Sequence, residues 1–126
     1  MKKLLLLVSF GVAIMSFTFP DGTQQIVNAF KRGDANEVAS YFDNLIDLKL
    51  PEKDELKNVS KNQAGITLKE FFDQNRVTGF DVTSQRELSG TMYITGKLAT
   101  STKDYGVTVL MKARGDKIYI ITVRIS

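Results

Sequence analysis

Residues 29–43 read AFKRGDANEVASYFD, and one helical pattern ends within this stretch while another begins. Gly33 can adopt the left-handed conformation that ends a helix. Asp34 can cap the next helix, with Glu37 three positions later as in a capping box. The apolar stripe of the first helix comprises Ile26, Val27 and Phe30, and that of the second Ala35, Val38, Ala39 and Phe42. We therefore predict two short helices that turn a corner at Gly33-Asp34 and cover one sheet.

The corner contains the tripeptide Arg-Gly-Asp at residues 32–34, which recurs at residues 114–116. This tripeptide can act as an integrin-type adhesion motif. It is also common by chance, and glycine and aspartate are ordinary turn residues. Turn formation accounts for both copies, so we do not interpret either as an adhesion site.

Alternating apolar residues follow the second helix and predict a strand. Its inward side comprises Ile46, Leu48 and Leu50. Pro51 ends this strand, and we expect a polar loop from there through Lys57. The acidic residues of the loop lack the ligand order and the central glycine of a calcium loop, so we interpret them as solvated. These residues are Glu52, Asp54 and Glu55.

A third helix is predicted next, because Ser60 and Gln63 have the spacing of a second capping box. One face of this helix carries Ala64, Leu68, Phe71, Phe72 and Asn75. Adjacent helix residues differ by about 100° in direction, so we expect one of the two phenylalanines to fill the core and the other to pack toward a strand edge. Gly65 weakens the helix, and a close helix–sheet contact there would explain it.

From Thr78 onward the apolar period is two, and short turns separate four runs, which predicts an antiparallel meander. The last strand allows two registers. A two-residue turn at Gly115-Asp116 needs a β-bulge at Ile121-Thr122 to bring Val123 and Ile125 into the core. A three-residue turn without a bulge would bury a different set: Tyr119, Ile121, Val123 and Ile125. We favour the bulge because it also bends the strand around the helices.

The first twenty residues, MKKLLLLVSFGVAIMSFTFP, have the pattern of a secretory signal peptide. Their apolar run is shorter than the ~20 residues that span a bilayer, so we expect cleavage rather than anchoring. A cut before Phe19 places Ser16 and Thr18 at the −3 and −1 positions, and a cut before Phe17 fits less well. The predicted organisation is a signal peptide over residues 1–18 and one domain over residues 19–126, exported to the periplasm or secreted.

The composition excludes several classes of function. The chain has no Cys and no His, which rules out disulfides, a lipoprotein anchor, Ser–His and Cys–His nucleophiles and His- or Cys-based zinc sites. The net charge of +3 includes Lys2 and Lys3; without them 15 basic residues face 14 acidic ones, a net charge of +1. Nucleic acid is therefore not an expected partner. No phosphate-binding loop is present, and we expect no cofactor and no metal.

The predicted order of elements resembles the cystatin-like, nuclear-transport-factor-2-like fold. The chain is also similar to domain of unknown function 4783, a family of small exported bacterial proteins. The stretches that carry this resemblance are AFKRGDANEVASYF, IDLKL, KNQAGITLKEFF and GVTVLMKARGDKIYIITVRIS. It implies an α+β fold in which three N-terminal helices pack on a strongly curved antiparallel sheet, and it carries no assigned activity. Many members have a His-Gly-like step where this chain reads Ser84-Gln85-Arg86, so a role for that histidine does not transfer.

Two carboxylates are candidates for a catalytic role, and Asp47 is the stronger of them. Enzymes with this fold can pair an aspartate base with a tyrosine donor. Asp47 lies on the first predicted strand, and Glu70 lies on the third helix. The candidate tyrosines are Tyr41, Tyr93 and Tyr119. Asp47 alternates away from the apolar side of its strand, so we expect it to face solvent and assign no catalytic residue.

The outer face of the predicted sheet is a candidate interaction surface, because several large apolar side chains point away from the helices. These residues are Tyr93, Leu110, Tyr119 and Ile121. We expect a non-enzymatic exported module that binds a protein, a peptide or a small ligand, with a homodimer through this face as one form. The alternative is a small-molecule enzyme with a carboxylate–tyrosine pair in a cavity between the helices and the curved sheet, which together form a cone in this fold.

Overall fold

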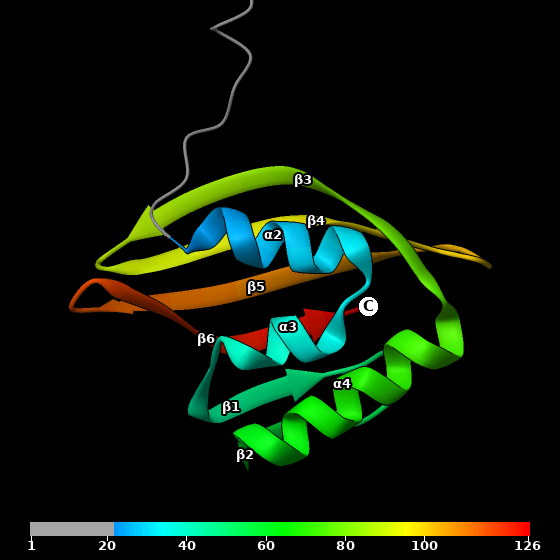
Figure 1. Ribbon diagram of the computed structural model, residues 1–126, viewed down its shortest axis with the longest axis horizontal. Coiled ribbons are helices and arrows are strands. Elements are labelled where there is room, and N and C mark those ends of the chain that lie inside the picture. The colour runs from blue at the N-terminus through cyan, green and yellow to red at the C-terminus, as the bar shows by residue number, and fades with distance from the viewer. Residues whose placement is uncertain (1–21) are drawn as a thin grey trace, which may run out of the picture.

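The computed structural model describes residues 22–126; the predicted signal peptide lies outside the described residues. The helices are α2 (Thr23–Arg32), α3 (Ala35–Ser40) and α4 (Lys61–Asn75). The strands are β1 (Phe42–Lys49), β2 (Leu56–Ser60), β3 (Val77–Leu88), β4 (Thr91–Thr100), β5 (Asp104–Arg114) and β6 (Lys117–Ile125). Figure 1 shows the three helices on one side of the sheet. The fold is α+β, as predicted.

The six strands form one sheet in the order β2-β1-β6-β5-β4-β3. The meander from β3 to β6 is antiparallel throughout, as predicted, and β1 joins it by pairing with β6 in parallel. The predicted loop through Lys57 is wrong at its end, because residues Leu56–Ser60 form β2 at the edge of the sheet. Asn58 in this strand has a φ of 54°, so the side chains of β2 do not alternate regularly between the two faces of the sheet. The sequence therefore lacks the alternation of apolar residues that predicts a strand.

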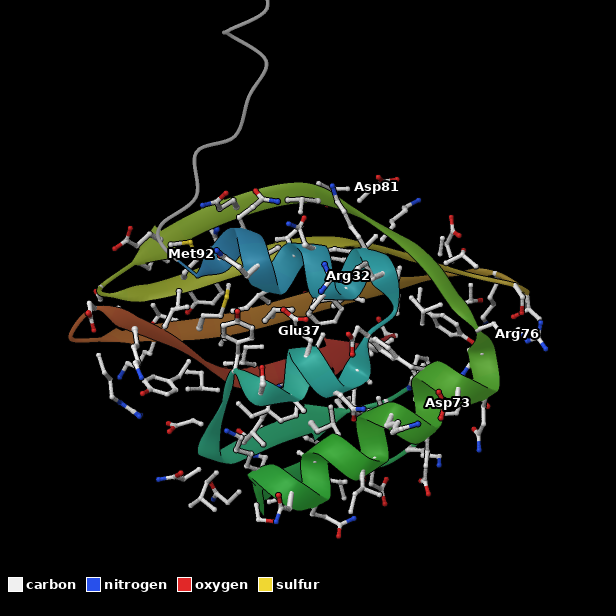
Figure 2. All side chains as sticks on the ribbon, viewed as in Figure 1. Arg32, Glu37, Asp73, Arg76, Asp81 and Met92 are labelled. Carbon is white, nitrogen blue, oxygen red and sulfur yellow. The ribbon has the colours of Figure 1, made fainter. Side chains whose placement is uncertain are left out.

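The helical corner forms as predicted. Gly33 has a φ of 67°, and a Cβ at this position would lie 2.7 Å from the carbonyl oxygen of Val77, so both conformation and space require glycine. Asp34 Oδ1 accepts a hydrogen bond from the backbone N–H of Glu37 at 3.0 Å. Figure 2 shows Arg32 and Glu37 facing each other across this corner, where they form an ion pair at 2.8 Å. The corner therefore fixes the direction of α3 relative to α2.

Some helix boundaries differ from the prediction. The N-cap of α2 is Gly22, which provides no side-chain cap. Phe42 belongs to β1, because α3 already ends at Ser40, although its side chain is buried as expected. Ser60 accepts a hydrogen bond from the backbone N–H of Gln63 at 3.1 Å, which confirms the cap of α4.

The bulge in the last strand is confirmed. Met111 pairs with Ile120, whereas the adjacent Leu110 pairs with Thr122, so Ile121 is the additional residue. The insertion shifts the parity of the strand. Val123 and Ile125 consequently point into the core, where both are fully buried.

Two further predictions about packing need correction. The close contact at Gly65 is with another helix, because a Cβ there would lie 3.2 Å from the Cβ of Ala39 in α3. The sheet is not strongly curled, and β1 and β2 precede α4 in the chain, so the three helices do not form an N-terminal block. Bulges bend individual strands, at Ile121 in β6 and between Val82 and Ser84 in β3, without curling the whole sheet.

Candidate functional site

The space between the helices and the sheet is filled by aliphatic side chains and a cluster of aromatic ones. Phe30 is fully buried, and its ring centroid lies 6.1 Å from that of Phe72 and 5.2 Å from that of Phe80. The ring of Phe71 points elsewhere and meets that of Tyr105 in β5 edge-on at 5.4 Å. Both adjacent phenylalanines are buried in the core, so the prediction that only one of them would fill it is wrong, although their rings contact different partners.

Ionisable side chains are absent from the buried core of residues 22–126. The buried polar residues there are Thr23 and Thr122. Within the same part of the chain, no group of three or more acidic, histidine or cysteine residues could hold a metal ion. The core is therefore suited to stability and presents no reactive group.

No helix of residues 22–126 is long and apolar enough to cross a bilayer.

Asp47, the candidate base, lies on the outer side of β1. It pairs with Thr122 of β6, and its Oδ1 accepts a hydrogen bond from the backbone N–H of Asn58 at 2.9 Å. Asp47 therefore helps to hold the left-handed residue of β2 in place. No hydrogen bond joins it to any of the three candidate tyrosines among residues 22–126, and Glu70 is exposed on α4.

The outer face of the sheet brings the four predicted interaction residues together. Leu110 pairs with Tyr93 of β4 on one side and with Thr122 of β6 on the other, next to the bulged Ile121. Tyr119 pairs with Lys112, two residues along β5 from Leu110. All four predicted side chains are half-buried. We call these four residues, Tyr93, Leu110, Tyr119 and Ile121, the outer-face patch.

Two arginines lie over the tyrosines of the outer-face patch. The guanidinium carbon of Arg86 lies 5.7 Å from the ring centroid of Tyr93, and that of Arg114 lies 5.2 Å from the ring centroid of Tyr119. Arg114 also forms a two-pronged ion pair with Asp43 of β1. Hydrogen bonding to Arg114 lowers the pKa of Asp43 to about 2, so this pair is charged in neutral solution.

A hollow that the sequence analysis did not anticipate opens below the β5–β6 turn, and we call it the hairpin hollow. It measures about 510 Å³ and is lined by Gly22, Ser40, Tyr41, Lys61, Asp116, Lys117, Ile118 and Tyr119. Its walls come from the starts of α2 and α4, the end of α3 and the turn of the hairpin, which share one side of the molecule in Figure 1. No sequence motif links these segments, since only the tertiary fold brings them together.

A second hollow, of about 430 Å³, lies over the helical corner and is lined largely by charged residues. Its basic residues already have acidic partners. Arg32 pairs with Glu37 at 2.8 Å, and Lys69 pairs with Asp73 at 2.8 Å. Since these charges are compensated, this hollow has little electrostatic preference for a ligand.

The sequence profile of the family described as "Domain of unknown function (DUF4783)" matches residues 23–126. The chain belongs to this family. A DUF4783 protein from Bacteroides ovatus is 29% identical, with a TM-score of 0.75 over 85% of this chain and 93% of that one. Another, from Bacteroides uniformis, is 24% identical, with a TM-score of 0.77 over 84% and 96% of the two chains. Family membership and fold therefore agree.

The fold extends beyond the DUF4783 family. A hypothetical protein with a ketosteroid isomerase-like fold from Catenulispora acidiphila, solved in complex with trimethylamine, is 13% identical, with a TM-score of 0.63 over 86% of each chain. This similarity confirms the nuclear-transport-factor-2-like fold and says nothing about activity. Among curated proteins, none matches the chain.

Proposed function

We propose that this DUF4783 protein is an exported, non-enzymatic binding module that acts through its exterior. The observation that carries the proposal is the apolar core of residues 22–126, in which the fully buried Phe30 packs against Phe72 and Phe80. The basic and apolar start of the chain supports export, with residues 1–18 as the cleaved signal.

The alternative, an enzyme with a carboxylate–tyrosine pair in the cone, has less support. Such an enzyme needs an ionisable group that faces an enclosed site, where burial can adjust its pKa. Asp47 is instead bonded to the backbone of Asn58, and Glu70 is exposed. Neither carboxylate is placed to act on a molecule inside the fold.

We propose that the outer-face patch binds a second copy of the chain. Tyrosine and arginine are enriched at protein interfaces, and this patch combines both with aliphatic side chains. Leu110 lies between Tyr93 and the bulge at Ile121, so it would occupy the centre of the contact. Central, well-packed side chains contribute most to binding.

Sedimentation equilibrium of residues 19–126 tests this proposal. We expect concentration-dependent dimers in the micromolar range and at least a tenfold weaker association for Leu110→Lys. Ile66→Lys is the matched control, because Ile66 is 58% exposed on α4 and the substitution adds the same charge away from the sheet. A wild-type monomer at about 0.5 mM, or equal weakening by both variants, would contradict the proposal.

A further inference from the structure

The hairpin hollow has an apolar and aromatic wall. Ile118 is buried, and Tyr41 packs against the core cluster. Tyr119 forms a further part of the wall, and its ring lies under the Arg114 guanidinium, which Asp43 holds in turn. Because these contacts fix the tyrosine ring from outside the hollow, the wall is arranged before any ligand arrives.

The rim of the hollow carries positive charge. Among the lining residues of the described part of the chain, Lys61 and Lys117 are basic and Asp116 is acidic, which gives these residues a net charge of +1. None of these three groups forms an ion pair within residues 22–126, although Lys61 Nζ donates a long hydrogen bond, of 3.4 Å, to the carbonyl oxygen of Ser40. The hairpin hollow thus differs from the hollow over the helical corner, whose basic residues are paired.

The start of α2 adds further hydrogen-bond donors on the same side. Gly22, which lines the hollow, is the N-cap of α2 and provides no side chain to accept hydrogen bonds from the first backbone N–H groups. The first turn also contains no acidic residue. Such a helix end favours a negative charge nearby, in the same sense as the two lysines.

We propose that the hairpin hollow binds a small amphipathic anion, an aromatic carboxylate. Its ring lies against Tyr41, Ile118 and Tyr119, and its carboxylate points toward Lys61 and Lys117. The volume of about 510 Å³ is within the range of small-molecule sites, which combine apolar walls with few charged groups. This site does not depend on association through the outer-face patch, although Tyr119 belongs to that patch and also lines the hollow.

Amide NMR titration of residues 19–126 with benzoate, benzyl alcohol and benzylamine tests the proposal. We expect benzoate to shift the amide signals of Tyr41, Ile118 and Tyr119 in a saturable manner. Benzyl alcohol should bind more weakly, and benzylamine weakest of the three. If no probe gives saturable shifts at the hollow, or if benzylamine binds as tightly as benzoate, the proposal is wrong.

Charge variants show which groups select the anion. The double variant Lys61→Gln, Lys117→Gln should weaken benzoate binding about threefold to tenfold, as expected for two solvent-exposed charges. The control Lys57→Gln, Lys97→Gln changes the net charge equally but on β2 and β4, away from the hollow, and should leave binding unchanged. Equal weakening by both double variants would overturn the proposal.

Asp116 provides a test in the opposite direction. Asp116→Asn removes the acidic group that residues 22–126 contribute to the rim, and it should tighten benzoate binding while weakening any binding of benzylamine. The residue lies in the exposed β5–β6 turn, so we expect this variant to remain folded. Unchanged or weaker benzoate binding would contradict the placement of the carboxylate beside the lysines.

Discussion

Replacing Phe30 by alanine should remove the centre of the aromatic core. The ring is fully buried and lies between those of Phe72 and Phe80. Loss of the ring leaves a cavity of about 100 Å³, which costs ~2.4 kcal/mol at about 24 cal/mol per Å³. Lost transfer of the ring from water adds ~2 kcal/mol. We therefore expect the free energy of unfolding to fall by about 4 kcal/mol.

Urea unfolding of residues 19–126, followed by circular dichroism, measures this change. Leu88→Ala is the control, because Leu88 is 52% exposed at the end of β3 and its truncation should change stability by less than about 0.5 kcal/mol. If Phe30→Ala is too unstable to study, Phe30→Leu retains most of the volume and should cost about 1 to 1.5 kcal/mol. Both variants should keep the wild-type dependence on urea.

A small loss would refute the reasoning. If Phe30→Ala costs less than about 1.5 kcal/mol with an unchanged urea dependence, the ring does not fill the core as described. The cavity provides a second measurement, since an apolar cavity stays dry and accepts xenon. Xenon should therefore stabilise Phe30→Ala more than the wild type, and an equal effect on both proteins would argue against a new cavity.

Two further predictions concern stability. The pKa of Asp43 is lowered to about 2, which corresponds to ~2.4 kcal/mol of stabilisation of the folded state. We reduce this value to about 1 kcal/mol because Arg114 is half exposed and solvent screens the pair. Asp43→Asn should therefore lower the free energy of unfolding by about 1 kcal/mol at pH 7. This cost should fade between pH 4 and 2, and a constant cost in chemical denaturation across that range would contradict it. Gly33→Ala should cost about 2 to 3 kcal/mol, because it adds a clash with Val77 to the strain of a positive φ. Gly115→Ala adds only the strain of a positive φ, without a clash, and should lower the free energy of unfolding by about 1 kcal/mol in the same denaturation assay. Equal losses of stability in the two variants would contradict the predicted clash between the Cβ added at position 33 and Val77.

Local signals in the sequence predict the elements that local interactions determine. Gly33 and Asp34 specify the corner because conformation and capping act within a few residues. The bulge at Ile121 was predictable for a different reason, since strict alternation would have buried Arg124 in place of Val123. Both inferences depend only on the pattern of neighbouring residues within one segment of the chain.

The parts that could not be predicted depend on distant segments. β2 has an exposed, polar sequence and is held by pairing with β1, including the Asp47–Asn58 hydrogen bond. Only the contact partner in α3 explains Gly65, because the close approach is to Ala39. The hairpin hollow likewise combines residues from about 95 positions apart in the chain, such as Gly22 and Lys117. The outer-face patch was accessible to sequence reasoning because its members alternate along neighbouring strands.

The parallel pairing of β1 with β6 has a consequence for the order of folding. β6 is the last of the described strands to be synthesised, yet it lies between β1 and β5. Until β6 is available, no strand pairing joins the β1–β2 pair to the β3–β5 ribbon. We therefore expect closure of the long loop between β1 and β6 to limit the folding rate. In a chain shortened before residue 117, contacts of the helices, such as Phe30 with Phe80, would remain as the link between the β1–β2 pair and the β3–β5 ribbon.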